Sequence, residues 1–204
     1  MQPQTIQSTA QAKPVIHELL ANRWSPRSFS SRPVETEKLA QLFEAARWAP
    51  SSYNAQPWSF IVATREDAEG FTQLLSTLVE PNREWAKNAP VLILGVTKRD
   101  FNHAARANRH AMYDLGQAAA NLTFQASVLG LQVHQMGGFD SAAARELFSI
   151  PEGYEPGAML ALGYPEGLGS VPDSRTRKPL TDFVFSGRWG TASQVVTENL
   201  NQGE

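Results

Sequence analysis

The strongest periodic signal in the chain is an apolar stretch over residues 110–129. Apolar side chains recur in it at alternating spacings of three and four, which is the period of one face of an α-helix. The members of this face are Met112, Leu115, Ala119, Leu122, Ala126 and Leu129. Ala111, Ala118 and Val128 widen the apolar surface and leave only a narrow polar stripe. A helix this apolar is buried around most of its circumference, so we expect it in the core or at a subunit interface.

Weaker patterns predict shorter helices on both sides of this one. Thr36 and Asp140 can each cap a helix, because their side-chain oxygens can accept hydrogen bonds from N–H groups of a first turn. Pro81 is expected to break a helix, since it has no backbone N–H. These helices are expected over residues 14–22, 37–48, 66–79 and 141–148.

Four short apolar runs predict strands. The run over residues 91–96 is continuous and lies between Pro90 and the polar residues 97–100, which is typical of a strand buried on both faces. The strands are expected over residues 58–63, 91–96, 131–136 and 158–162.

Helices and strands together predict one α+β domain over residues 14–186. We expect a polar N-terminal extension over residues 1–13. The C-terminal tail, residues 187–204, has too few large apolar groups to form a core of its own. We therefore expect that tail to fray or to lie across another surface.

Composition excludes several classes of function and says less about the fold. The 204 residues carry a net charge of -2 and are 42% hydrophobic and 19% charged, which favours a folded globular protein and argues against a nucleic-acid partner. Cysteine is absent, so thiolate catalysis and disulfides are excluded. Neither a signal peptide nor an apolar run of membrane-spanning length is evident, so we expect a soluble, cytoplasmic protein with no membrane partner.

Two arginine-bearing segments lie at opposite ends of the chain. Residues 23–29 read RWSPRSF and residues 175–180 read RTRKPL, so each places guanidinium groups beside Ser or Thr hydroxyls. Guanidinium is planar and permanently charged, which suits a phosphate that must be oriented as well as held. Taken alone, either segment is more often a solvated loop, and the hypothesis depends on their joint occurrence.

Other common chemistries have weaker support. The four histidines are dispersed, and each is more often structural or exposed than catalytic. Gly167 and Gly169 are not followed by a third glycine at the spacing of a dinucleotide-binding turn, and the chain has no P-loop. We therefore expect no catalytic side chain, no metal site and no dedicated fold for a nicotinamide coenzyme.

Four ordered motifs make the chain resemble the nitroreductase family. An Arg-x-Ser-x-Arg/Lys-x-Phe/Tyr element is matched at residues 23–29, and Pro-Ser-Ser-x-Asn-x-Gln-Pro-Trp is matched at residues 50–58 without a gap. A Gly-Phe-Asp turn follows a strand at residues 138–140, and a basic-x-Arg pair closes the series at residues 175–177. The resemblance covers about residues 14–182, and four motifs in order are far more specific than one.

The resemblance implies an FMN site made by two subunits. Phosphate contacts would come from Arg23, Ser25, Arg175 and Arg177, and Arg27 would reach the pyrimidine side of the flavin. The backbone N–H groups of Gly137 and Gly138 would face flavin N5 and O4. Trp24 and Met136 are expected to line the same site. The partner subunit would add contacts from Pro50, Ser51, Ser52, Asn54 and Gln56.

The activity implied by the resemblance is an FMN-dependent oxidoreductase with the chemistry carried by the flavin. NADH or NADPH would reduce FMN, and a nitroaromatic, a quinone or a similar small acceptor would reoxidise it in a ping-pong cycle. A homodimer is implied, with the 110–129 helix as the candidate for its core and a C-terminal tail exchanged between subunits. The fold implied is a central mixed or antiparallel sheet flanked by helices.

Two alternatives stay open at this point. Proteins of the same fold carry out other redox reactions, including reductive dehalogenation, azoline oxidation and flavin fragmentation. The chain could also bind or store FMN without efficient turnover. The short segment between Val96 and His110, where longer relatives place substrate-covering helices, makes the substrate pocket the least transferable part of the resemblance.

Overall fold

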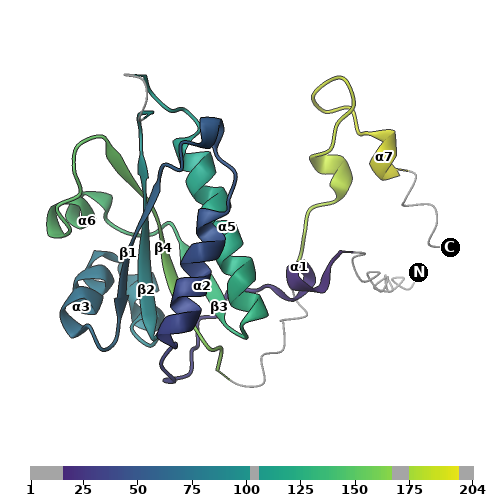
Figure 1. Ribbon diagram of the computed structural model, residues 1–204. Helices are drawn as coiled ribbons and strands as arrows, with labels where there is room; N and C mark the ends of the chain where they lie inside the picture. The colour runs from purple at the N-terminus through teal and green to yellow at the C-terminus, as the bar shows by residue number, and fades with distance from the viewer. Residues whose placement is uncertain (1–15, 102–105, 167–174, 198–204) are drawn as a thin grey trace, which may run out of the picture. The chain divides into compact units, whose positions relative to one another are not determined.

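A four-stranded antiparallel sheet forms the centre of residues 16–166 in the computed structural model of the chain (Figure 1). The strands are β1 (Trp58–Thr64), β2 (Val91–Lys98), β3 (Gln132–Met136) and β4 (Tyr154–Gly163), in the spatial order β1-β2-β4-β3. The structure describes residues 16–101, 106–166 and 175–197. The predicted α+β architecture is confirmed, and every strand pair in this sheet is antiparallel.

The two central strands explain the most apolar part of the sequence. β2 is buried over residues 91–97 because β1 and β4 pair with its two edges and helices cover both of its faces. β4 begins at Tyr154, four residues before the predicted start at Ala158, because pairing with β2 continues past a register shift at Gly95/Val96. The apolar pattern fades there, but the backbone hydrogen bonds do not depend on it. β3 pairs only with β4 and forms one edge of the sheet.

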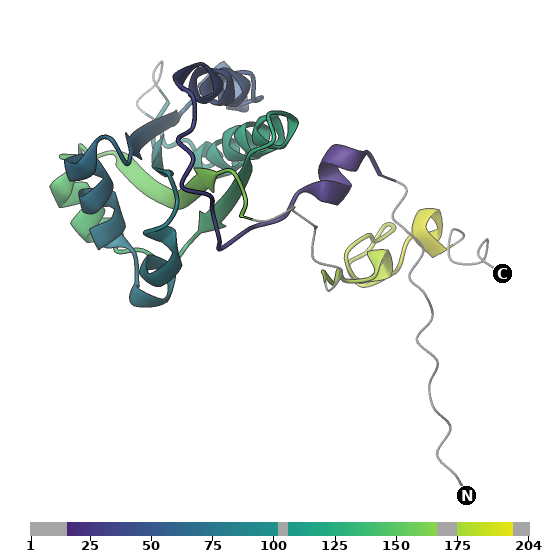
Figure 2. The same ribbon diagram turned by 90° about the horizontal axis from the view of Figure 1, so that it is seen from below.

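Two long helices cover one face of the sheet (Figure 2). They are α2 (Thr36–Arg47) and α5 (Ala111–Val128), which pack side by side. The core between these helices and the sheet includes Leu42, Ile93, Leu122 and Leu160, all at most 1% exposed. α5 ends where Gly130 adopts φ 74° and Leu131 N–H bonds the Ala126 carbonyl at 2.8 Å, a glycine stop of the expected kind.

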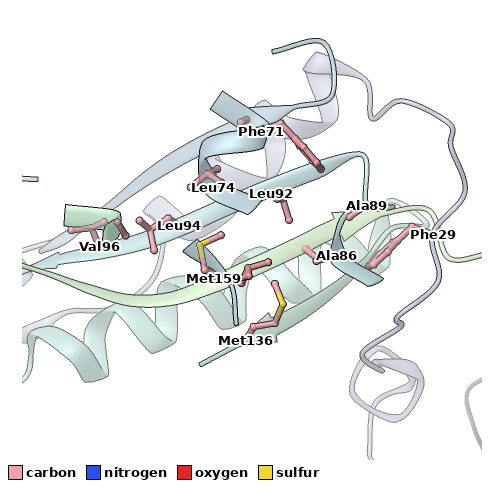
Figure 3. Close-up of a cluster of buried hydrophobic side chains, with 14 of the residues drawn as sticks. Phe29, Phe71, Leu74, Ala86, Ala89, Leu92, Leu94, Val96, Met136 and Met159 are labelled. Carbon is pink, nitrogen blue, oxygen red and sulfur yellow. The ribbon is translucent and has the colours of Figure 1, made fainter. Parts of the chain in front are cut away.

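Three shorter helices cover the opposite face: α3 (Ala68–Thr77), α4 (Glu80–Ala86) and α6 (Ser141–Leu147). Figure 3 shows their core, with Met136 and Met159 from neighbouring strands below Leu92 and with Phe29 at one end. The expectation that Pro81 breaks the helical pattern is wrong in part. Pro81 lies in the first turn of α4, where a missing N–H costs nothing, so a second helix follows almost at once. Asp140 caps α6 as predicted, with Oδ1 accepting from Ala142 N and Ala143 N at 3.0 Å.

The remaining elements are single turns: α1 (Glu18–Asn22), η1 (Ser52–Asn54), η2 (Leu180–Asp182) and α7 (Gln194–Thr197). The chain divides into two compact units between Val171 and Pro172, ahead of the expected boundary at residues 186/187. Within the second unit a bridge joins Phe185 to Ala192, and the Phe185 and Trp189 rings lie 5.1 Å apart. The expected N-terminal extension, residues 1–13, lies outside the described residues. None of the helices described is long and apolar enough to cross a membrane.

Gly163→Ala tests the packing at the end of β4. An added Cβ would lie 2.5 Å from Cγ and Cδ of the Pro90 ring and 3.1 Å from the Phe29 ring. Overpacking of this kind costs about 1–3 kcal/mol, so the free energy of unfolding from urea titration should fall by that amount. Gly137→Ala is the matched control in flavin-free protein, because nothing lies within 4 Å of its Cβ. Equal stability of the two variants would contradict the packing described.

Candidate functional site

The segment from Arg23 to Arg27 lies against β3, the edge strand. The carbonyl oxygen of Pro26 is 2.9 Å from Nδ1 of His134 in the middle of that strand. Because a carbonyl oxygen only accepts, this nitrogen carries the proton and donates. Nearer the start of β3, the Trp24 N–H reaches Oε1 of Gln132 at 3.5 Å. Side chains of the edge strand therefore hold the arginine segment beside it.

The arginine segment places positively charged side chains beside β3. Burial lowers the pKa of His134, and the nearby guanidinium groups of Arg27 and Arg23 lower it further. Nη1 of Arg23 donates to Oγ of Ser25 at 3.0 Å, with Arg23 half-buried and Ser25 exposed. A guanidinium and a hydroxyl thus lie side by side at the surface, which is a donor set that phosphate prefers.

The end of β4 fixes the chain that follows this segment. Ser30 N–H donates to the Tyr164 carbonyl at 2.9 Å. The Tyr164 hydroxyl donates to Glu35 at 2.6 Å and lowers the pKa of that carboxyl to about 2. Lys38 Nζ in turn donates to the same hydroxyl at 2.6 Å. β3 therefore holds the arginine segment, and the residue after β4 holds the chain that follows it.

Two glycines directly after β3 present free backbone donors. Within the parts of the chain that the structure describes, the N–H groups of Gly137 and Gly138 have no hydrogen-bond acceptor. The Gly138 carbonyl accepts from Val79 N at 3.1 Å and from Asn82 Nδ2 at 3.0 Å, so the start of α4 holds this turn in place. A Cβ added at Gly137 would meet nothing within 4 Å, so the space beside its backbone is open.

The arginine segment and the glycines share one strand, and this sets the distance between them. Gly137 follows His134 by three residues, or about 10 Å of extended chain. Met136, which is 3% exposed, packs its side chain in the core, so only its backbone is available to a ligand. The Pro26 carbonyl and the glycine N–H groups are thus about 10 Å apart along the strand, and Arg23 and Ser25 lie further back, on either side of the Trp24 N–H that contacts Gln132.

The loop over residues 50–56 has a strained backbone and is held by hydrogen bonds. Tyr53, Asn54 and Gln56 adopt left-handed backbone conformations, with φ of 54°, 53° and 45°. Oγ of Ser51 accepts from Gln56 N at 3.0 Å, and Ser52 N donates to Oδ2 of the buried Asp114 at 3.1 Å. Such strain at non-glycine residues costs about 1–3 kcal/mol each and clusters at functional sites. Pro50, Asn54 and Gln56 are exposed.

This loop lies at the opposite end of the sheet from the arginine segment. Pro57 binds Lys98 N–H at 2.8 Å, and Lys98 pairs with Tyr154 at the start of β4. The arginine segment reaches Gln132, which pairs with Gly163 at the end of β4. Nine residues of strand separate these two pairs, which is about 30 Å. Within one chain, this loop therefore lies far from the expected phosphate donors Arg23 and Ser25.

α5 carries an exposed stripe of small and apolar residues. Tyr113 is 70% and Val128 is 56% exposed, and Gly116, Ala120 and Phe124 between them are exposed or half-buried. The expectation that α5 is buried around most of its circumference is therefore right for one side only. Ala119 and Leu122 lie in the core of their own chain, at 4% and 0% exposure, while α1 lies against α5 near Val128 and the rest of the stripe faces outward.

A pocket beside the strained loop was not anticipated from the sequence. It encloses about 470 Å³, and its lining includes Ser52, Tyr53, Phe101, Arg106, Arg109 and His110. The signal that could have identified it is the basic composition of residues 98–110, with four arginines or lysines and one aspartate.

Arg175 and Arg177 belong to the second compact unit. Arg175 is half-buried, and Nη1 of the exposed Arg177 donates to the Thr176 carbonyl at 2.8 Å. Their approach to Arg23 and Ser25 stays a prediction.

Comparison with known proteins assigns the family. A family model described as the nitroreductase family matches residues 20–81 and 68–164. A Methanothermobacter thermautotrophicus protein, provisionally named an NADH dehydrogenase/NAD(P)H nitroreductase, is 30% identical over 153 residues, which cover 72% of this chain and 76% of that protein.

Solved structures agree over a larger part of the chain. The crystal structure of an oxidoreductase containing FMN superposes with a TM-score of 0.80 at 32% identity, over 92% of this chain and 100% of the other. A nitroreductase family protein of Clostridium difficile gives a TM-score of 0.72 at 30% identity, over 84% of this chain and 97% of the other. From the four sequence motifs, the fold of residues 16–166 and these matches it follows that the chain belongs to the nitroreductase family.

Proposed function

We propose that this protein is an FMN-dependent oxidoreductase that transfers electrons from NADH or NADPH to a nitroaromatic, a quinone or a similar small acceptor. The observation that carries the proposal is β3, where the Arg23–Ser25 pair flanks Trp24, which contacts Gln132 at the start of the strand, and where the free N–H groups of Gly137 and Gly138 follow its end, about 17 Å further along the chain. The FMN named for a solved relative and the nicotinamide chemistry named for a curated one support it.

The residues present fit FMN. Its phosphate needs charge-assisted donors, which Arg23 and Ser25 provide at the surface. Its ring needs hydrogen-bond donors with open space in front of them, and the backbone at Gly137 has both. Arg27 adds positive charge at the same edge, where it would stabilise a reduced, anionic ring.

Bound FMN supplies two-electron chemistry, because its ring can take a hydride from nicotinamide and pass the electrons on. The electron balance for a quinone is NAD(P)H plus one solvent proton plus quinone, giving NAD(P)⁺ and hydroquinone. The role of the protein is then to orient the ring through the glycine N–H groups and to hold the phosphate. A ping-pong order is expected, since no dinucleotide-binding turn provides a separate place for the coenzyme.

The decisive experiment is the visible spectrum of the purified protein, followed by acid release and identification of the chromophore. We expect FMN, reduced by NAD(P)H under anaerobic conditions and reoxidised by a quinone. Steady-state rates should then give parallel double-reciprocal lines. A colourless protein that ignores added FMN, or a bound FAD, would refute the proposed cofactor. Bound FMN that NAD(P)H does not reduce would instead indicate a storage protein.

We also propose that the site is completed by a second copy of the chain. The Ser51–Gln56 loop lies about 30 Å from the arginine segment of its own chain, so it could reach the phosphate end of FMN only in another subunit. The exposed stripe on α5 supports such a dimer, because Gly116 and Ala120 allow a second helix to come close while Tyr113, Phe124 and Val128 add apolar area. The C-terminal unit is the candidate for a segment exchanged between subunits.

Ala120→Glu tests the dimer. The substitution places a charge in the exposed stripe of α5 without touching the core, so it should give a folded monomer that has lost tight FMN binding. Light scattering and flavin retention after gel filtration would measure both properties. Ala142→Glu, an exposed helical position on α6, is the matched control and should remain a flavin-loaded dimer. A folded Ala120→Glu monomer that holds FMN tightly would show that one chain makes the whole site.

Arg177→Ala tests whether the second unit reaches the phosphate. Loss of a charge-assisted contact costs about 1.5–3 kcal/mol, so the FMN dissociation constant should rise about ten-fold or more. Lys178→Ala removes the neighbouring exposed charge and should leave FMN binding close to that of the unmodified protein. Fluorescence titration of flavin-free protein with FMN would compare them, and equal dissociation constants would remove Arg177 from the site.

A further inference from the structure

The pocket beside the strained loop combines an accessible aromatic ring with unpaired cations. Tyr53 is 77% exposed and is held in a left-handed conformation, with φ 54°, in which its ring packs edge-on against the buried Phe101 at 5.7 Å. An exposed aromatic residue whose backbone is strained into place is costly to maintain for stability alone. Its position at the mouth of a cavity of about 470 Å³ suits a ligand with one flat ring.

Arg106 and Arg109 supply the charge of this pocket. The Arg106 guanidinium lies 5.3 Å from the centre of the Phe101 ring, and both arginines are exposed. Among the residues that the structure describes, no carboxylate forms an ion pair with either arginine. Asp114, the acid nearest in sequence to His110 on α5, is 2% exposed and accepts the Ser52 N–H. The guanidinium groups are therefore available to an external anion.

The backbone around these arginines is fixed. Asn108, which lies between them and is 4% exposed, donates its N–H to the Arg99 carbonyl at 2.7 Å and accepts from His110 N at 3.0 Å through Oδ1. Phe101 N–H bonds the Arg106 carbonyl at 3.1 Å. Hydrogen bonds at Arg106 and at Asn108 hold this segment in position before a ligand arrives, which reduces the entropy lost on binding.

We propose that this pocket selects acceptors that carry an anionic group, by binding the carboxylate or sulfonate of a single-ring aromatic acceptor between Arg106 and Arg109 with its ring against Tyr53. The proposal rests on the proposed function, and it specifies the substrate class of that site. Because Ser52 and Tyr53 belong to the loop expected beside the partner's FMN, an acceptor held here would lie next to the flavin. The cavity fits one substituted ring better than a whole dinucleotide.

The test compares 4-nitrobenzoate with its neutral analogue 4-nitrobenzamide in Arg106→Gln and Arg109→Gln. Isothermal titration calorimetry with the oxidised, FMN-loaded dimer gives the dissociation constants, and stopped-flow reoxidation gives the acceptor half-reaction alone. Each variant should weaken 4-nitrobenzoate about five- to ten-fold, as expected for one charge-assisted contact, and should change 4-nitrobenzamide less than about two-fold. Arg99→Gln removes the same charge outside the pocket lining and should change neither ligand by more than about two-fold.

Three results would overturn the proposal. Equal weakening of the charged and the neutral ligand would mean that the arginines do not recognise charge. Unchanged 4-nitrobenzoate binding in both variants would remove them from the pocket. If the variants impair reduction by NADPH alone, and leave reduction by NADH and binding of 4-nitrobenzoate unchanged, the arginines bind the phosphate of the coenzyme and not an acceptor. If the chain does not retain FMN, the proposed function fails, but the same titration into flavin-free protein still decides whether the pocket binds the aromatic anion.

Discussion

The candidate site depends on one constraint of sheet topology, the position of β3 at the edge of the sheet. An edge strand has a side that no other strand occupies, and side chains of β3 contact residues 24 and 26 of the arginine segment. β3 ends at Met136, and the N–H groups of Gly137 and Gly138, directly after it, have no acceptor among the described residues. Edge strands are usually protected against pairing with other chains. In this protein the arginine segment lies against side chains of the edge strand, where we propose that a ligand binds.

Helix α4 holds the turn after β3 and a side chain of β3 in position. The start of α4 binds the Gly138 carbonyl twice, and Trp85 from the same helix packs on His134 with ring centres 4.4 Å apart. Tyr164, directly after β4, ties down the chain beyond the arginine segment. These supports act on backbone and on side chains that a ligand would not touch. These contacts hold the glycine N–H donors in position before a ligand binds. Less conformational entropy would then be lost on binding, which favours affinity.

The length of the sheet has a second consequence, because it separates the arginine segment from the loop at residues 50–56 within a chain. The strained loop at residues 50–56 is anchored to Asp114 near the start of α5, at the far end from Arg23. The proposed site, assembled from both halves, would therefore need two copies of the chain, and the exposed residues of α5 would give them a surface to share. The arginine pocket lies at the same end as the loop. In this proposal, binding of the cofactor phosphate and choice of the acceptor fall to different subunits.

The sequence by itself determined the elements whose signals are local. The three-and-four spacing predicted α5 to within a residue at each end, the continuous apolar run predicted β2, and Asp140 predicted the cap of α6. The four motifs also identified the family, since residues that bind a common cofactor recur in a fixed order. Pro81 was misread because proline is unfavourable inside a helix and favourable in its first turn, and composition does not distinguish the two.

Only the tertiary structure decided which residues meet. Ala119 and Leu122 face the core and Ala120 and Phe124 face outward, because the packing of α2 and the sheet against α5, and not its periodicity, selects the buried side. The 30 Å between the arginine segment and the strained loop follows from strand order and length. The pocket of Tyr53, Arg106 and Arg109 joins residues more than fifty positions apart through Phe101. Long-range contacts of this kind produce no periodic pattern in the sequence. The sites that they form can therefore be identified only from the folded structure.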